Sequence, residues 1–214
     1  MEFELLGWPE DGPQLRLDHR EFSYAGKFVM SNTGKAVVRE SEATSGGGAP
    51  EDATESPEAD SPHGESASGE DGETPDYADD VVAAVAFNED RTDPATAWLR
   101  YVTVRTGRRG DGIGARLTAF AADRLESTGY DRVKIAVNNP FAYRALHKAG
   151  FGYTGEETGL AELVLARPGD RSPERYRAGL DAYRERDDLA PEERSFLDEQ
   201  SGAGPPERID PPSG

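Results

Sequence analysis

The sequence contains no cysteine, which excludes disulfide bonds, thiolate metal sites and a cysteine nucleophile. Its three histidines, His19, His63 and His147, lie far apart, and this spacing disfavours a histidine-rich metal site. No apolar run approaches the roughly 20 residues that span a membrane, and Met1 to Glu4 lack the basic and apolar pattern of an export signal. We therefore expect a cytoplasmic protein with no metal and no membrane partner.

Lysine is also scarce, with 4 lysines against 20 arginines, and the formal net charge is −18. The negative charge lies outside the centre of the chain. Residues 41–77 contain 11 Asp and Glu but no Lys or Arg, whereas residues 78–168 carry 12 acidic and 12 basic side chains. This bias favours a halophilic archaeon as the source, where a charged surface maintains solubility; a GC-rich genome with one acidic linker is the alternative. Without a clustered positive surface, we expect no nucleic-acid partner.

Two segments of contrasting composition precede the centre. Residues 1–40 look β-rich, because Gln14–Asp18 alternates at period two and because Lys27–Met30 and Ala36–Val38 flank a turn. Residues 41–77 are dominated by Ser, Gly, Pro, Glu and Asp and have almost no large apolar side chains. Since such a composition cannot offset the entropy of ordering, we predict a disordered acidic insertion there.

Strand and helix patterns return in residues 78–168. In chain order they are strands at 81–87 and 97–104 joined as a hairpin, a helix at 115–128, a strand at 133–137, a helix capped by Asn139, and a strand at 160–165. These elements are typical of an α+β (α/β) domain.

Residues 169–214 form a C-terminal extension that is predicted to be helical. Ser172-Pro173-Glu174 and Pro191-Glu192-Glu193 mark the starts of two helices. Tyr176, Leu180 and Tyr183 share one face of the first helix, and we expect this stripe to dock on the core. The proline-rich tail that follows, Gly202–Gly214, is predicted to be disordered.

The turn between strand 97–104 and helix 115–128 reads Arg109-Gly110-Asp111-Gly112-Ile113-Gly114. A helix N-terminus has unpaired N–H groups and partial positive charge, and glycines without Cβ atoms let a diphosphate approach those groups. Between residues 99 and 124, six arginines face two aspartates. The pattern favours a diphosphate-binding turn over a glycine-rich connector whose arginines are merely solvated.

Two other phosphate-binding schemes fit less well. Thr33-Gly34-Lys35-Ala36 imitates a Walker loop but lacks its first glycine and its hydroxyl. Gly110-x-Gly112 with Ala115 satisfies a weak form of the dinucleotide-binding turn, but the strand before it belongs to a hairpin.

Arg109-x-x-Gly112-x-Gly114 resembles the Arg/Gln-x-x-Gly-x-Gly/Ala motif of the GNAT superfamily of acyl-coenzyme A-dependent N-acetyltransferases. The stretch from Asn139 to Phe151 is similar to the family's Asn-x-x-Ala helix that ends in Gly-Phe. The resemblance covers residues 78–166 and implies a strongly twisted mixed sheet flanked by helices. The first 40 residues are shorter than the family's usual N-terminal lobe with its two substrate-binding helices.

The resemblance also implies roles for individual residues. Val102 and Val104 would offer backbone groups to the pantetheine arm of acetyl-coenzyme A, the implied cosubstrate, and the end of their strand would point an amide at the thioester oxygen. Asn139 would meet the pantetheine or the acyl end, besides capping its helix. The diphosphate would be held by Arg109, Gly110, Asp111, Gly112, Ile113, Gly114 and Ala115.

The catalytic proton donor departs from the family pattern. Leu146 stands where many relatives carry a tyrosine that protonates the leaving thiolate. Tyr143, one turn earlier, is the candidate general acid, with His147 beside it, and packing is the alternative role for both. Candidate bases in the hairpin turn are Glu89, Asp90 and Asp93, for which solvated turn positions are the alternative.

We therefore expect an N-acetyltransferase that moves an acetyl group from acetyl-coenzyme A to a primary amine by direct attack, because no nucleophile for a covalent intermediate is visible. The acceptor could be a small metabolite, an antibiotic-like amine, or a protein terminus or lysine, and the protein a monomer or homodimer. The alternative is a non-catalytic acyl-coenzyme A-binding regulatory module. A dinucleotide-dependent enzyme is the third hypothesis.

Overall fold

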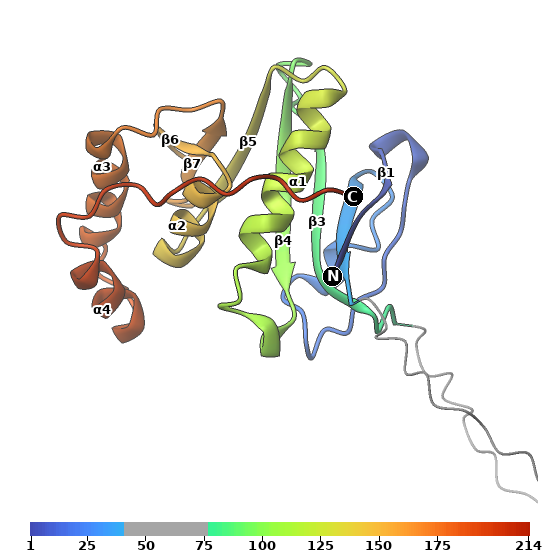
Figure 1. The fold of residues 1–214 in the computed structure, drawn as a ribbon, viewed down its shortest axis with the longest axis horizontal. Coiled ribbons are helices and arrows are strands. Elements are labelled where there is room, and N and C mark those ends of the chain that lie inside the picture. The colour runs from blue at the N-terminus through green and yellow to red at the C-terminus, as the bar shows by residue number, and fades with distance from the viewer. Residues whose placement is uncertain (41–76) are drawn as a thin grey trace, which may run out of the picture. The chain divides into compact units, whose positions relative to one another are not determined.

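A computed structural model of the protein describes residues 1–40 and 77–214, so the insertion predicted at 41–77 lies outside the described residues except for Tyr77. Seven strands form one sheet in the order β1-β2-β3-β4-β5-β7-β6 (Figure 1). The strands are β1 (Glu2–Gly7), β2 (Gly34–Arg39), β3 (Val81–Glu89), β4 (Thr96–Val104), β5 (Arg132–Val137), β6 (Gly152–Glu157) and β7 (Leu163–Arg167). The helices are α1 (Ile113–Ser127), α2 (Pro140–Lys148), α3 (Pro173–Arg184) and α4 (Pro191–Glu199). The sheet is mixed, as predicted, because only β4 and β5 pair in parallel.

Helix α1 covers one face of the sheet. Its buried side chains include Leu117, Phe120, Ala121 and Leu125, the face predicted from the sequence, and they pack with inward-facing residues of β1 to β5. Helix α2 lies beside α1 and has the predicted cap, since the Ala142 N–H donates to Asn139 Oδ1 over 2.8 Å. The predicted hairpin of β3 and β4 is confirmed as an antiparallel pair.

Residues 12–33 cover the opposite face of β2 and β3, where Leu15, Leu17 and Phe28 are buried. The strands predicted at 14–18 and 27–30 are wrong, because this segment is irregular with one 3-10 turn. Leu15 N–H does donate to the Phe28 carbonyl over 3.0 Å, but the pairing does not continue as a ladder. The alternation at 14–18 arises because the chain lies flat on the sheet and directs every second side chain into it.

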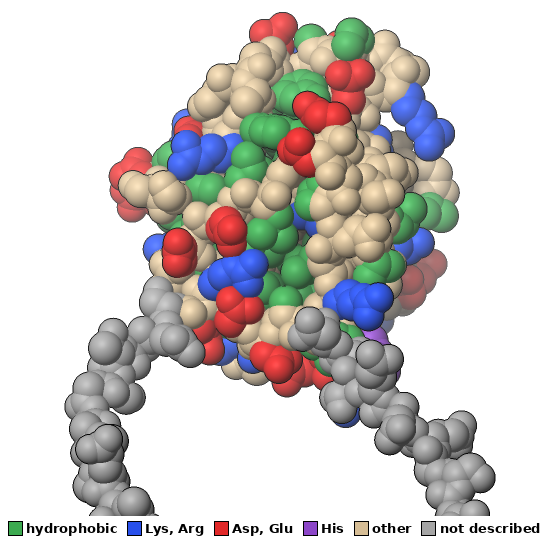
Figure 2. All heavy atoms as spheres, turned by 90° about the vertical axis from the view of Figure 1, so that its right-hand side faces the viewer, with side chains coloured by type: hydrophobic (Ala, Val, Ile, Leu, Met, Phe, Trp, Pro, Cys, Tyr) green, Lys and Arg blue, Asp and Glu red, His purple; other side chains and the backbone are tan. Residues whose placement is uncertain are grey.

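Buried Lys35 on β2 holds this covering segment in place. Its ammonium donates to the carbonyls of Pro13 at 2.5 Å, Met30 at 2.7 Å and Thr33 at 3.0 Å. The Walker-like Lys35 is therefore a structural donor with no exposed surface. Around the edge that carries β1, hydrophobic side chains reach the surface between interspersed acidic and basic ones (Figure 2).

Both predicted C-terminal helices are present, and Tyr176, Leu180 and Tyr183 are fully buried as expected. Strand β6 was not predicted, and the strand predicted at 160–165 is β7, which begins later, at Leu163. Within the described residues, no helix combines the length and apolar character needed to cross a membrane.

The tail, predicted to be disordered, instead lies along the helices (Figure 1). Ile209 N–H donates to the carbonyl of Lys148 at the end of α2 over 2.9 Å, and Arg171 donates to the carbonyl of Pro206 over 2.8 Å. Gly214 lies against the ring of Phe120 on α1. Prolines reduce the entropy that ordering such a segment costs, so a few contacts are enough to hold it.

Candidate functional site

The sheet splits between its two parallel strands. β4 and β5 pair only from Thr96 with Arg132 to Leu99 with Ile135, and beyond this point the strands diverge (Figure 1). We call this divergence the splay. The register of β4 against β3 shifts at the same place, because Ala86 faces Tyr101 while Phe87 faces Leu99, which leaves Arg100 as the extra residue of a β-bulge.

The splay exposes main-chain groups of β4. Arg105 N–H donates to the Val82 carbonyl on β3 over 2.9 Å, and in an antiparallel pair the residues that bond to the partner alternate with residues that do not. By this alternation the N–H and C=O groups of Val102 and Val104 point away from β3, toward the side that β5 has left. Both residues are half-buried. This geometry is the one required for pairing with an extended ligand arm.

The glycine turn meets the end of β4 at the N-terminus of α1. Gly110 and Gly112 have φ values of 93° and 76°, and a Cβ built on either would meet no heavy atom of the described chain within 4 Å. Gly112 is the N-cap and has no side chain to bond the first N–H groups of the helix, whose first turn contains no acidic residue. A Cβ on Gly114 would lie 3.4 Å from Val104 Cγ2, so the helix start and β4 are adjacent.

The three arginines of the turn differ in their partners. Arg105 donates to the Val81 carbonyl and forms an ion pair with Glu21 at 3.2 Å. Arg108 pairs with Glu40 and with Asp111, the latter at 3.2 Å, so the only carboxylate of the motif is neutralised within the turn. Arg109 is exposed, and within the described part of the chain its bonds go to neutral groups, the Val104 carbonyl at 3.3 Å and Ser23 Oγ at 2.9 Å.

These features together fit the diphosphate and pantetheine of coenzyme A. The open glycine cradle and the unpaired amides of Ile113, Gly114 and Ala115 suit a diphosphate, and Arg109 can add a cationic donor. The backbone edge at Val102 and Val104 suits the amide-containing pantetheine arm. The structure thus brings together the residues that the sequence predicted to hold the cofactor, except Asn139, which begins α2 on the other side of the splay.

Tyr143 has a structural position. It has no exposed surface, stacks on Tyr176 with ring centroids 5.5 Å apart, and donates its hydroxyl to the Tyr176 carbonyl over 3.0 Å. Burial raises the pKa of Tyr143 far above its ordinary value. Leu146 is also buried. This placement argues against Tyr143 as the proton donor.

His147 and the hairpin carboxylates are likewise held by the fold. Burial lowers the pKa of His147 to about 4, and its Nδ1 lies 3.1 Å from the Tyr143 carbonyl. Asp90 accepts hydrogen bonds from Thr92 and from the Trp98 indole, which hold the pKa of its carboxyl below its usual range. Asp93 accepts from Thr96 Oγ1 at 2.7 Å. These contacts give Asp90 and Asp93 turn-forming roles.

Sequence reasoning missed two contributors to the site. The Tyr183 hydroxyl donates to the Val137 carbonyl over 2.9 Å and fixes the end of β5, and no local pattern distinguished that contact from ordinary docking. The bulge at Arg100 has no marker in the sequence, because an arginine between Leu99 and Tyr101 also fits a regular strand.

A mixed sheet that splits beside a glycine turn and a helix N-terminus defines a GNAT-like fold. Residues 39–151, just over half of the chain, match the family model described as "Acetyltransferase (GNAT) family", and the chain belongs to this family. Its members are typically acetyl-coenzyme A-dependent N-acetyltransferases. A comparison with curated proteins finds no match.

Solved structures with a similar fold include nourseothricin acetyltransferase, at 20% identity and a TM-score of 0.36, over 41% of this chain and 57% of that chain. The PaiA N-acetyltransferase of Thermoplasma acidophilum in complex with coenzyme A has 16% identity and a TM-score of 0.34, over 40% and 52%. An acetyltransferase of Bacillus subtilis in complex with CoA has 18% identity and a TM-score of 0.36, over 42% and 70%. The chain thus spans little more than half the length of the first two structures.

Proposed function

We propose that this protein is an acetyl-coenzyme A-dependent N-acetyltransferase that acts on a primary amine by direct transfer. The observation that carries the proposal is the glycine cradle at the start of α1, which opens beside the splay, where main-chain groups of β4 point away from β3. Val102 and Val104 would align the pantetheine arm, and Arg109 to Ala115 would hold the diphosphate. Asn139 would contact the pantetheine arm or the acyl group from the side of β5.

Acetyl transfer from a thioester needs few catalytic side chains once both substrates are aligned. Acetyl-coenzyme A supplies an activated acetyl group with a thiolate as leaving group. The amine nitrogen bonds to the acetyl carbon, the carbon–sulfur bond breaks, and the proton lost by the amine ends on the thiolate. An amide of β4 at the bulge would polarise the acetyl oxygen, and positioning alone can supply several orders of magnitude in rate.

A non-catalytic acyl-coenzyme A-binding module is the second candidate. It is favoured by the burial of Leu146, which stands in the family's tyrosine position, and of Tyr143, whose hydroxyl is already bonded. Such a module would bind acetyl-coenzyme A tightly and release no thiol when amines are added.

Two glycine variants test the cofactor site. Gly112→Glu places bulk and negative charge in the cradle, and we expect it to weaken coenzyme A binding at least 100-fold in calorimetry. Gly112→Asn is the matched control, because asparagine tolerates the positive φ at this position and is uncharged. Equal affinity in Gly112→Glu and Gly112→Asn would refute the cradle assignment.

Catalysis is tested by thiol release from acetyl-coenzyme A with a panel of amines. Amine-dependent thiol release, with mass-spectrometric detection of the acetylated amine, supports the transferase. Tight binding without turnover of any amine favours the regulatory module.

A further inference from the structure

The face of the splay opposite α1 carries a group of aromatic and cationic side chains. Leu99 packs toward α1, so its neighbour Trp98 lies on the opposite face, and Tyr101 packs there against the cluster formed by residues 12–33. The bulge adds Arg100 to the same face, with its guanidinium carbon 5.1 Å from the centre of the Trp98 ring. Trp98, Arg100 and Tyr101 therefore share one face of the sheet at the point where β4 leaves β5.

This face is open at the splay, whereas the other face is covered by α1. Arg100 is exposed and Trp98 and Tyr101 are half-buried. An amine that attacks an acetyl group held beside the bulge must therefore arrive from the side of Arg100. The side chains there would be the first that the acceptor meets.

The charge on this face is positive. Lys134 on β5 lies 5.8 Å from the Trp98 ring centre, and Lys27 lies 5.8 Å from the Tyr101 ring centre. Among residues 1–40 and 77–214, no ion pair includes Lys27, Arg100 or Lys134. Asp90 is a carboxylate that acts on both Arg100 and Lys134, but it forms an ion pair with neither of them.

The charged groups around Arg100 do not cancel it. Asp90 is the carboxylate that acts on it, and it is held by Thr92 and the Trp98 indole, while Arg91 adds a further positive charge. The side-chain partner of Arg100 is neutral, since Nε donates to Asn88 Oδ1 over 2.6 Å. Although the Arg100 side chain has exposed surface, neighbouring groups desolvate part of it and lower its pKa, and no carboxylate of the described residues bonds it. Such a cation is stabilised by an incoming carboxylate.

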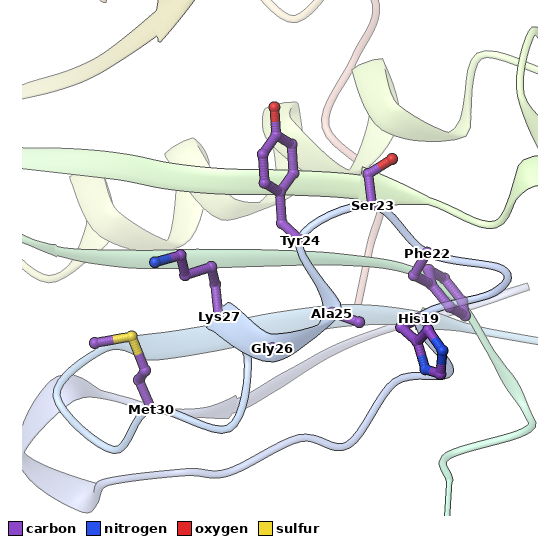
Figure 3. A pocket seen from close by; sticks show the side chains of 8 residues that line it. All are labelled: His19, Phe22, Ser23, Tyr24, Ala25, Gly26, Lys27 and Met30. Atoms are coloured by element: carbon purple, nitrogen blue, oxygen red, sulfur yellow. The ribbon is translucent and has the colours of Figure 1, made fainter.

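A hollow of about 570 Å³, which Lys27 and Tyr24 help to line, lies near this face (Figure 3). It is formed by the segment from His19 to Met30, and Tyr24 at its rim lies 5.9 Å from the Tyr101 ring centre. Ser23, also at its rim, bonds Arg109 of the cofactor turn, so the hollow adjoins the cofactor site. It offers apolar room for the body of an acceptor.

We propose that the acceptor is a primary amine that also carries a carboxylate, bound with its carboxylate on Arg100 and its carbon skeleton against Trp98 and Tyr101. This inference rests on the proposed transferase function and adds the acceptor class to it. Lys134 and Lys27 raise the local positive potential. The carboxylate can belong to a small amino acid or to an acidic residue at a peptide N-terminus.

Matched acceptor pairs test the proposal and separate these two sources. Thiol release is measured with 4-aminobutyrate against its carboxamide, and with the peptide amide Glu-Ala-Ala against Gln-Ala-Ala. We expect kcat/KM to favour the acid of at least one pair by about tenfold or more, since a hydrogen bond to a charged group contributes about 1.5–3 kcal/mol. If neither acid is preferred while the amides are acetylated, the inference is refuted and the proposed function stands.

A charge-removing variant supplies the second arm. Arg100→Gln should lower kcat/KM for the preferred acid about 10- to 100-fold and leave its amide within about threefold. Arg132→Gln is the control, because Arg132 of β5 is an exposed arginine on the same face of the sheet. Arg132 pairs with Thr96 of β4, which lies about 13 Å from Arg100 along that strand at about 3.3 Å per residue. An equal loss in Arg132→Gln would show that general charge, not this site, governs selectivity.

Binding without turnover is the third readout. In calorimetry on the protein saturated with coenzyme A, the acid should bind to the wild type and lose affinity in Arg100→Gln, while the Kd of coenzyme A stays unchanged. Unaltered acid binding in Arg100→Gln would overturn the inference. If coenzyme A binds but no amine of the panel is acetylated, the proposed function fails, and the inference fails with it.

Discussion

The substitution Gly179→Ala in α3 tests the structural role assigned to Tyr143. A Cβ at Gly179 would lie 2.1 Å from the Tyr143 hydroxyl oxygen and 2.4 Å from Cζ, far inside contact distance. Tyr143 has no free space to retreat into, since it contacts Tyr153, Tyr176 and Tyr183 and is fully buried. Gly179→Ala must therefore displace the ring and break its hydrogen bond to the Tyr176 carbonyl.

Opposing free-energy contributions determine how much Gly179→Ala changes the stability of the protein. Alanine gains up to about 1 kcal/mol over glycine inside a helix. Overpacking costs about 1–3 kcal/mol, and loss of the buried hydrogen bond about 1 kcal/mol. The balance is a destabilisation of about 2 kcal/mol, which for a chain of this size corresponds to a fall in Tm of about 4–8 °C.

A double-mutant cycle read by urea and thermal unfolding separates the contributions. Tyr143→Phe removes the atom closest to the new methyl group, so Gly179→Ala should cost at least about 1 kcal/mol less in that background. A rise in Tm of Gly179→Ala in the wild-type background would refute the packing argument. The same Tyr143→Phe variant should retain kcat for acetyl transfer within about threefold, whereas loss of a general acid typically costs about 100-fold or more.

Further predictions concern buried groups. The pKa of His147 is lowered to about 4 by burial, so its contribution to stability is complete above the unfolded-state pKa of about 6.5 and is lost as pH falls from there toward 4. Urea unfolding should show about 2–3 kcal/mol less stability at pH 4.5 than at pH 7.5 from this group, and His147→Leu should remove that difference. Lys35→Met should destabilise the protein by about 3 kcal/mol or more, because three backbone carbonyls and Thr33 Oγ1 lose their donor. Amide hydrogen exchange should then increase in residues 13–33; unchanged protection there would contradict the role given to Lys35.

Local signals in the sequence predicted the backbone elements around the candidate cofactor site. The helix that follows Asn139 was predictable because a cap and Pro140 at its first position act within one turn. The glycine turn was predictable because positive φ values are required of Gly110 and Gly112 where they stand. These features depend on near neighbours in the chain.

Features set by distant contacts could not be predicted in this way. Leu15 and Leu17 alternate like strand residues, but which surface they cover depends on β2 and β3. The burial of Tyr143 depends on α3, whose Tyr176 lies 33 residues later in the chain. The bulge at Arg100 depends on how β4 meets β3 and β5 together.

The ordered tail has a thermodynamic consequence. Pro206 and Ile209 bind elements on the β5 side of the splay, whereas Gly214 lies against Phe120 of α1 and the carbonyl of Phe3. A ligand that changes the separation of β4 and β5 must therefore also change the free energy with which the tail is docked, and this coupling acts equally in both directions. If coenzyme A binds in the splay as proposed, we expect it to change the rate at which a protease trims residues 203–214, far from the protease's own site of action.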